Sequence, residues 1–382
     1  MHRTSGIALV MSLLLIVILV VLVGQLSYSV KIDSFIAENE TSEVQIQYAL
    51  LSATNYAIAQ LQLDTLKEES TKENWDAYTD EWGTPLWTHS KPYQMGKVSV
   101  FYNISDENER FNLTTLIKKQ PKKDEKDKKD DKDKNDDKDE NNDKDKNNEN
   151  NNSNNNGENK DDDNPDQPEE PKEPMTPSDH FKRLMKVLLK KNETINIDAL
   201  ESSMKHWMEK KESNSDEIVG PFPTKVPLYS VKELIMAKDI KNDYIFGYID
   251  PKDEKKSFVG LWLYTTVWSD GAININTASK ELLCSLHSKI SDKLSDFIIY
   301  HRRTEGEDKK IQIFKKPDDL KNIKQIDERT SRIFSDITPI ITTKSSYFRI
   351  EAYANSGRLH KKLTTIVYRQ GRKIFKIFCD YE

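Results

Sequence analysis

Two cysteines and seven histidines are the residues of this chain most able to support catalysis, redox chemistry or metal binding. Cys284 and Cys379 are the only possible disulfide pair, and the sequence leaves open whether they pair in an oxidising compartment or remain free thiols. Neither cysteine has the neighbours expected of a catalytic thiol or a metal site. The histidines do not combine with carboxylates or thiols at the spacing of a catalytic triad. We therefore expect a structural protein, not an enzyme, with no small-molecule substrate.

The element that must position everything else is an apolar stretch near the N-terminus, residues 7–26, which contains no charged residue. Twenty helical residues at about 1.5 Å each span about 30 Å, the thickness of a bilayer's hydrocarbon core. A plain membrane anchor, a cleaved secretory signal and a pilin-type assembly segment each fit this stretch. The secretory signal fits least, because its apolar core would span only about 7 to 15 residues before a small-x-small cleavage site.

The region after the apolar stretch predicts a continuation of the same helix. No Gly or Pro lies between Gln25 and Trp82, so one helix can run from the membrane to about Leu66. Its second half carries an apolar stripe at helical spacing, formed by Ile46, Leu50, Ala53, Ala57 and Leu61. A simple anchor does not need this stripe, so we expect the stripe to pack on a folded domain.

A charged segment, residues 118–175, explains the low mean hydropathy of the chain. Residues 118 to 174 contain 14 Lys and 21 Asp plus Glu and no apolar side chain, whereas the rest of the chain has 44 basic and 43 acidic residues. Such a composition cannot bury enough surface to offset the entropy of ordering, so we expect a disordered linker. A calcium-holding or partner-binding acidic tail is the alternative, and the interleaved lysines favour a solvated spacer.

Alternating apolar residues predict strands at two distant places in the chain. The first strand is predicted at 97–104, after an aromatic loop at 74–95. Its inner face would be formed by Val98, Val100, Tyr102 and Ile104. Three antiparallel strands near the C-terminus are predicted at 347–354, 363–368 and 373–378.

These strands and the long helix predict one interrupted α+β domain. A single strand is not stable by itself, so the first strand should join the C-terminal strands in one antiparallel sheet, covered by the apolar stripe of the helix. The two parts of this domain would be residues 27–117 and 341–382, with residues 176–340 as an inserted α-helical domain. Helices in the insertion are predicted at 177–189, 197–209, 230–237, 279–286 and 292–301. Thr176 with Asp179, and Ser230 with Glu233, have the spacing of N-terminal caps.

The most distinctive motif of the insertion is Gly271-Ala-Ile-Asn-Ile-Asn-Thr-Ala-Ser-Lys-Glu-Leu-Leu283, in which Asn276 or Thr277 is expected to cap a helix. This motif resembles two families: the helix-hairpin-helix of membrane-anchored competence DNA receptors, and the K-type minor pseudopilin of type II secretion. A DNA-binding hairpin needs a Gly-rich turn whose backbone N–H groups approach a phosphate, and 286–290 contains no Gly. Lys309, Lys310, Lys315 and Lys316 form a local basic cluster that we interpret as a solvated face. We therefore expect no nucleic-acid partner.

Four further segments resemble the pseudopilin, also called general secretion pathway protein K, in the same order along the chain. They are 98–113, which looks like the family's segment with the pattern V-x-V-x-x-x-D-E-x-G-x-F-N-L, 206–209, 227–234 and 345–350. The resemblance implies a type IV pilin-like fold and a minor pseudopilin that caps the pseudopilus tip and helps to start its assembly. A competence-type DNA receptor and a minor pilin of a related type IV filament remain the alternatives.

The N-terminus resembles a type IV prepilin signal, with a short leader, residues 1–6, that ends in Gly6. In that family a membrane peptidase cuts after the Gly and the new N-terminus is methylated, which implies cleavage between Gly6 and Ile7 and methylation of Ile7. Most pilins have Glu at the fifth mature position, which is Met11 here. That carboxylate neutralises the ammonium of the subunit above, because an unpaired charge in an apolar filament core is costly. Met11 therefore favours a subunit with no neighbour above it.

The resemblance also implies partners, a location and a metal site. The partners would be other minor pseudopilins, the major pseudopilin and the prepilin peptidase, in a single-pass protein of the bacterial inner membrane with a cytoplasmic N-terminus and a periplasmic bulk. Family members can bind calcium near 206–209, and hard cations need several oxygens. The candidate calcium ligands are Glu209, Glu212, Asp216 and Glu217. An exposed charged turn is the alternative for this region.

Overall fold

The structure is a computed structural model of the full chain, and it describes residues 3–117, 175–189, 195–214, 227–252, 257–306, 311–323 and 326–382. Met1–Lys118 and Thr176–Glu382 form one compact unit. The predicted linker, residues 118–175, lies outside the described residues except for Met175. The insertion, residues 176–340, therefore packs with the rest of the chain in a single unit.

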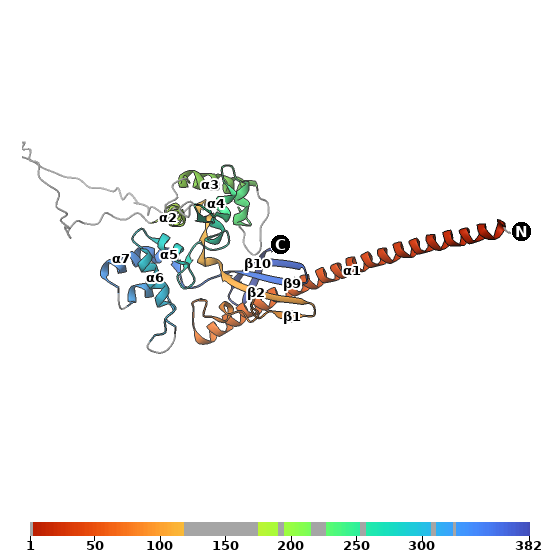
Figure 1. Cartoon of the computed structure of the whole chain (residues 1–382). Coiled ribbons are helices and arrows are strands. Elements are labelled where there is room, and N and C mark those ends of the chain that lie inside the picture. The colour runs from red at the N-terminus through yellow and green to blue at the C-terminus, as the bar shows by residue number, and fades with distance from the viewer. Residues whose placement is uncertain are drawn as a thin grey trace, which may run out of the picture. The chain divides into compact units, whose positions relative to one another are not determined.

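The elements follow one another in the order shown in Figure 1. The α-helices are α1 (Arg3–Thr71), α2 (Pro177–Leu189), α3 (Ile197–Asn214), α4 (Asn242–Phe246), α5 (Lys280–Leu286), α6 (Asp292–His301) and α7 (Glu328–Ile337). The short 3-10 helices are η1 (Glu81–Gly83), η2 (Glu107–Glu109), η3 (Leu113–Leu116), η4 (Val231–Met236), η6 (Leu261–Leu263), η7 (Pro317–Asn322) and η8 (Thr338–Ile340). The strands are β1 (Tyr93–Met95), β2 (Val98–Asp106), β3 (Phe111–Asn112), β4 (Gly247–Tyr248), β5 (Phe258–Val259), β6 (Thr265–Thr266), β7 (Ile273–Asn274), β8 (Ile341–Thr342), β9 (Tyr347–Ser356), β10 (Leu359–Gln370) and β11 (Lys373–Tyr381).

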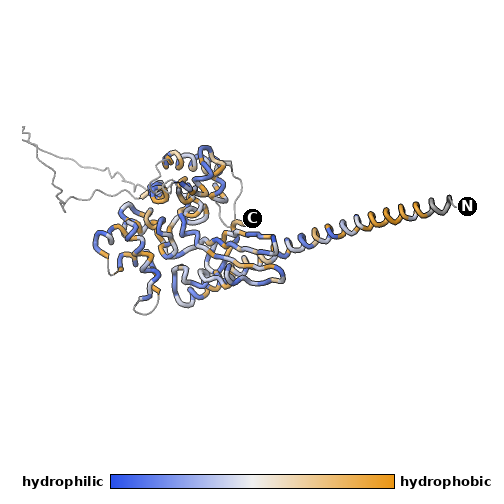
Figure 2. Tube along the Cα trace, in the orientation of Figure 1, coloured by the Kyte–Doolittle hydropathy of each residue, from blue (hydrophilic) through white to orange (hydrophobic). Residues whose placement is uncertain are grey.

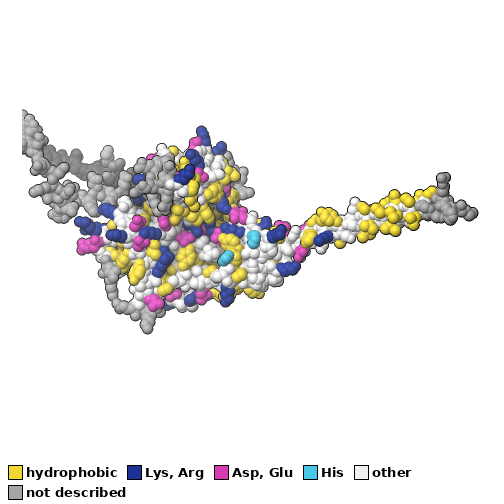
Figure 3. Space-filling model, viewed as in Figure 1, with side chains coloured by type: hydrophobic (Ala, Val, Ile, Leu, Met, Phe, Trp, Pro, Cys, Tyr) yellow, Lys and Arg dark blue, Asp and Glu magenta, His cyan; other side chains and the backbone are white. Residues whose placement is uncertain are grey.

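The long N-terminal helix is confirmed, and it continues past the predicted end to Thr71. Lys72 ends it with a positive φ of 58°, a conformation that stops the helical ladder. The N-terminal part of α1 is apolar and exposed, as Figures 2 and 3 show. It is long and apolar enough to cross a membrane by length and composition, which is compatible with a single-pass anchor.

The second half of α1 packs on the main sheet through the predicted stripe. Ile46, Leu50, Ala53, Ala57 and Leu61 are all fully buried. They meet the inner faces of β2 and β9 in one hydrophobic core, and Figure 1 shows this part of α1 lying against the sheet. Small Ala side chains at two of the five positions allow the helix to approach the strands closely. This core is what fixes the helix to the domain.

The main sheet has five strands in the order β1-β2-β9-β10-β11, and every neighbouring pair is antiparallel. β2 pairs with β9 in the register Val100↔Ala354 and Ile104↔Ile350. The sheet is therefore completed by strands that lie before and after the insertion in the chain. The predicted inner face of β2 is buried along its whole length.

Part of the aromatic region at 74–95 is a strand, so its prediction as a loop alone was wrong. Tyr93–Met95 forms β1 and pairs with β2. Its three residues are all exposed, so no inward-facing pattern marked it as a strand. Trp87 stacks on Tyr56 and on Tyr93, with ring centroids 4.6 and 4.7 Å apart, and so ties this edge to α1.

The insertion contains the predicted helices but is not purely helical. α2, α3, α5 and α6 lie where they were predicted, and the capping box of Ser230 and Glu233 is present at a 3-10 helix, η4. Ser279 caps α5, not Asn276 or Thr277 as predicted, because the side chains of the latter two are held elsewhere. α4 and α7 were not predicted. Two parallel bridges, β3 with β6 and β7 with β8, join the insertion to the chain on either side of it.

The buried and exposed faces of α1 can be distinguished by a matched pair of variants. Leu50→Ala should lower the free energy of unfolding by about 2–5 kcal/mol, because Leu50 is fully buried against the sheet. Leu51→Ala, at the exposed next position of the same helix, should change it by less than about 0.5 kcal/mol. Urea unfolding of the full chain in detergent micelles measures both. Equal effects of the two variants would show that this face of α1 is assigned wrongly.

Candidate functional site

Three of the segments that carry the family resemblance, 98–113, 271–283 and 345–350, meet at one buried carboxylate, Asp106, at the end of β2. Its Oδ2 accepts hydrogen bonds from Asn274 Nδ2 at 3.0 Å, Thr277 Oγ1 at 2.7 Å and Ser345 Oγ at 2.6 Å. Its Oδ1 accepts from the backbone N–H of Asn108 at 2.8 Å. Burial raises the pKa of Asp106 to about 7, against the opposing effect of the Ser345 and Thr277 hydrogen bonds. One carboxylate thus joins the first strand, the insertion motif and the start of β9.

The two asparagines of the motif are structural residues. Asn274 Nδ2 also donates to the backbone carbonyl of Asp76 at 3.1 Å and to Ser345 Oγ at 2.8 Å. Asn276 makes a reciprocal pair with the backbone of Phe314, donating to its carbonyl at 2.9 Å and accepting from its N–H at 3.1 Å. Buried amides satisfied on both sides are typical of a fixed junction. This explains why these side chains do not cap α5.

A second buried carboxylate, Glu107, pairs with two arginines beside the first. It accepts from Arg349 Nε at 2.5 Å, from Arg110 Nη1 at 3.3 Å and from Thr266 Oγ1. Burial alone would raise the pKa of Glu107, but Arg349 and Arg110 overcome that effect and hold it below its usual range. Arg349 lies on β9 and Thr266 on β6, so this ion cluster also links the sheet to the insertion.

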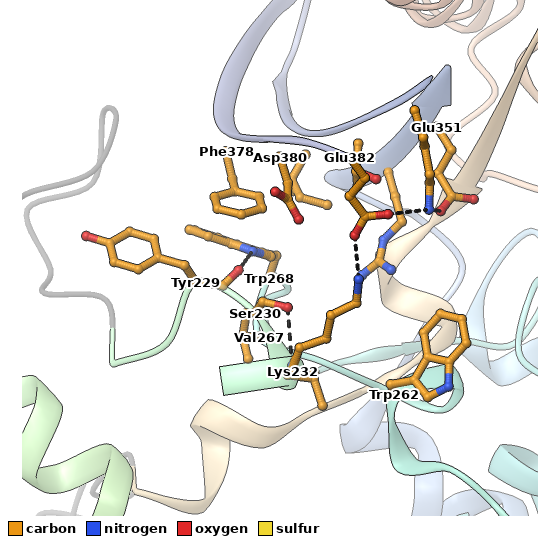
Figure 4. A pocket seen from close by; sticks show the side chains of 15 residues that line it. Tyr229, Ser230, Lys232, Trp262, Val267, Trp268, Glu351, Phe378, Asp380 and Glu382 are labelled. Atoms are coloured by element: carbon orange, nitrogen blue, oxygen red, sulfur yellow. Dashed lines mark hydrogen bonds and ion pairs between the residues drawn. The ribbon is translucent and has the colours of Figure 1, made fainter. Parts of the chain in front are cut away.

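A small cavity lies where the insertion covers the outer face of β10 and β11, shown in Figure 4. Trp268 Nε1 donates to the carbonyl of Tyr229 at 2.9 Å, and the Trp268 ring stacks on Phe378. Lys232 donates to Glu382 at 2.6 Å across the seam. The cavity has a volume of about 50 Å³, room for a water molecule or two and far below the size of a ligand site. We interpret it as the seam between two packed surfaces.

The predicted hairpin is present as α5, a turn at 287–291, and α6. Ser291 Oγ accepts from the backbone N–H of Leu294, so a side chain already caps the start of α6. No Gly occurs in the turn, so no residue there leaves bare backbone for a phosphate. Lys315 and Lys316 are exposed, and the other two members of the predicted basic cluster, Lys309 and Lys310, lie outside the described residues.

The two cysteines are free thiols, so the disulfide that the sequence allowed is not formed. Cys284 is buried on α5, with its Sγ 3.0 Å from Ser295 Oγ on α6, and burial raises its pKa. Cys379 is exposed on the edge strand β11, next to Thr365. Cys284 lies in the helical hairpin and Cys379 lies at the edge of the sheet, so the two thiols contact different residues.

The calcium candidates are only partly described. Glu209 and Glu212 lie on the last turns of α3, where Glu209 is exposed, and Asp216 and Glu217 lie outside the described residues. The calcium site therefore stays a prediction. Among the histidines, His180 is buried beside Ser285 Oγ at 2.9 Å, and burial lowers its pKa to about 3, so it is neutral.

The processing and assembly residues lie within α1. Ile7 and Met11 are exposed, on the apolar N-terminal part of the helix, and Gly6 is in the same helix. The predicted cleavage between Gly6 and Ile7 stays a prediction. A cluster of three carboxylates, Asp64, Asp76 and Asp80, lies at the other end of α1 and was not predicted from the sequence.

Comparison with solved structures identifies the fold. A chain of the crystal structure of the GspK-GspI-GspJ complex from the enterotoxigenic Escherichia coli Type 2 Secretion System matches with a TM-score of 0.51 and 12% sequence identity. The match covers 91% of this chain and 99% of that chain. The chain has a pilin-like α+β fold. Because the match covers nearly all of both chains, the similarity includes the insertion as well as the sheet and α1.

Sequence comparison adds one local match. Residues 269–332 match the model of the helix-hairpin-helix motif, which covers α5, the turn and α6. Comparison with curated proteins finds no match. The motif match agrees with the backbone of the hairpin seen in the structure.

The junction can be tested through its central amide. Asn274→Ala would leave the buried acceptors on Asp106, Asp76 and Ser345 without this donor, and should lower the free energy of unfolding by about 2–4 kcal/mol. Asn103→Ala, at an exposed position of β2, should change it by less than about 0.5 kcal/mol. Thermal unfolding of the full chain in micelles compares the two. A loss in Asn274→Ala no larger than in Asn103→Ala would show that the network adds no stability.

Proposed function

We propose that the protein is a minor pseudopilin of a type II secretion system that caps the tip of the pseudopilus and helps to start its assembly. The observation that carries this proposal is the fold: a long helix with an apolar N-terminal part, packed on a sheet interrupted by a large insertion. A structure with this fold, from the GspK-GspI-GspJ complex, matches nearly its full length. The role is structural, because assembly and bulk account for the helix and the insertion without any reaction.

The tip position is supported by two features of the chain. Met11 replaces the carboxylate that would neutralise the terminal ammonium of a subunit above, and a subunit with no neighbour above needs no such carboxylate. The insertion adds bulk that the Asp106 junction joins to the sheet, and this bulk should hinder the stacking of another subunit above. Helix α1 would still pack against subunits below.

The proposed partners are other minor pseudopilins, the major pseudopilin and the prepilin peptidase. The structural neighbour is itself part of a complex of three proteins, which supports association with pilin-like partners. The proposed location is the inner membrane, with α1 as its single span and the sheet and insertion in the periplasm. A minor pilin of a related type IV filament would share all of these features.

A competence-type DNA receptor is the second candidate, and the match to the helix-hairpin-helix motif at residues 269–332 favours it. The turn without Gly and the Ser291 cap oppose it, because they leave no open backbone cradle for a phosphate. Tight, strongly salt-dependent binding of the full chain to duplex DNA would replace the pseudopilin proposal with this one.

Processing after Gly6 is the first test of the pseudopilin proposal. In cells with a prepilin peptidase, mass spectrometry of the purified protein should show a chain that begins at methylated Ile7. Gly6→Leu should leave the leader attached, because the peptidase requires Gly at this position. Gly24→Leu is the matched control and should be processed normally, since a side chain there would meet nothing within 4 Å. An intact Met1 in the wild-type protein would contradict the proposal.

The tip position predicts the behaviour of a restored carboxylate. Met11→Glu should not increase pseudopilus assembly or protein secretion, because no ammonium from a subunit above would pair with the new charge. Met11→Gln, of similar size and without charge, is the control for added polarity. Filament yield and secreted protein should be equal in the two variants. A gain with Glu and not with Gln would place a subunit above this one.

A further inference from the structure

A group of carboxylates is packed around the C-terminal end of α1. Asp64 and Glu68 come from α1 itself, and Asp76 and Asp80 come from the segment that follows it. One carboxylate oxygen each of Asp64, Asp76 and Asp80 lies within 4.8 Å of the others. Asp76 is fully buried and Asp64 is 3% exposed, so water cannot screen these charges effectively.

Two cations face these carboxylates from other elements. Arg369 of β10 contacts Asp64 Oδ2 at 3.2 Å through Nη1 and Asp76 Oδ2 at 2.5 Å through Nη2. Lys344, which follows β8, contacts Glu68 and lies 3.5 Å from Asp76 Oδ2. The cluster therefore contains more acids than bases.

Other charged groups nearby do not supply the missing positive charge. Asp106 lies behind Ser345, whose N–H donates to Asp76 at 2.7 Å and whose hydroxyl donates to Asp106 at 2.6 Å. On the surface, Glu69 pairs with Arg372 and Lys67 with Glu81, while Lys72 and Glu73 line the groove above the cluster. The neighbours of the buried acids are thus a further acid and surface groups that already have partners or lie at the rim.

Simultaneous ionisation of all these acids is unfavourable, so the folded cluster retains protons that an unfolded chain would release. Burial, with the nearby charges of Asp76 and Glu68, raises the pKa of Asp64 to about 7 against the effect of Arg369. Burial likewise raises the pKa of Asp80 to about 7, and that of Glu68 above its usual value.

Because of where the cluster lies, these protons affect the contact between the end of α1 and the segment that leads from the insertion into β9. The Asp76 carboxylate accepts from the N–H of Ser345, in the segment where the chain leaves the insertion and enters β9. The backbone N–H of Asp76 donates to the carbonyl of Thr343 at 2.7 Å in the same segment. The cluster therefore joins the end of α1, the return from the insertion and β10.

We propose that this cluster is a proton-dependent joint, which holds the end of α1 firmly to the return from the insertion in acid and loosens as the pH rises toward neutrality. At about pH 4 and below, Asp64 and Asp80 are protonated in both the folded and the open state, so their protons do not favour opening. Between about pH 4 and pH 7, Asp64 and Asp80 hold protons in the folded joint but not in the open state, so a rise in pH favours opening. Above about pH 7, Asp64 and Asp80 are ionised in the folded joint as well, so a further rise in pH lowers the stability of the joint little more.

Amide hydrogen exchange of the full chain in micelles tests this joint. After correction for intrinsic exchange, opening of residues 60–71 and 343–346 should increase about tenfold per pH unit for each proton released, between about pH 5 and pH 7. Asp64→Asn with Asp80→Asn keeps the size and an oxygen acceptor at both positions, and should flatten this dependence. Glu69→Gln removes a surface acid on the same turn and should leave it unchanged.

Several outcomes would overturn the joint. They are opening in the wild-type protein that does not change with pH, an equal slope in the double variant, or a flattened slope in Glu69→Gln. The wild-type measurement alone decides the matter where the double variant does not fold. None of these results depends on filament assembly, so they leave the proposed function standing.

Discussion

The packing of this protein depends on a carboxyl group held without water. Asp106 is fully buried at the point where the chain leaves the sheet for the insertion, and a bare carboxylate there would be costly. Its cost is offset by donors that come from the insertion and from the start of β9. The carboxylate therefore helps to specify which segments meet, since its donors come from separate parts of the chain. Hydrophobic contacts fill the space around the junction, while the hydrogen bonds determine its geometry.

The same division of labour is seen along α1. Its apolar stripe packs on the sheet through non-directional contacts, whereas its last turns are held by polar contacts of Asp64 with Arg369 and of Glu68 with Lys344. The insertion also depends on more than one kind of interaction. It is joined to the sheet by parallel bridges and by the Glu107 ion cluster, so its removal would expose buried charges of the sheet. The insertion is therefore part of the fold and not a separable module.

Features that repeat locally could be predicted from the sequence, and those that depend on distant partners could not. The stripe of α1 and the inner face of β2 follow from spacing alone. β1 was missed because its three exposed residues have no inward face. Asn274 stood out in a motif, but its partners lie at Asp76, Asp106 and Ser345, which no local pattern connects. The acidic cluster did leave one signal, since Asp64 continues the buried face of α1 three residues after Leu61.

The pairing of β2 with β9 has a consequence for biosynthesis. Ser99 and Asn355 are bonded although they are 256 positions apart, so the sheet cannot close until almost the whole chain has left the ribosome. Contacts between such distant residues slow folding. Loop length itself adds little, because each doubling costs only about 0.6 kcal/mol. Until the last strands arrive, the stripe of α1 has no sheet to cover it, and the nascent chain presents an apolar helix face along two different stretches. The apolar N-terminal part of α1 is thus made at the start of synthesis, whereas the core of the domain can form only near its end.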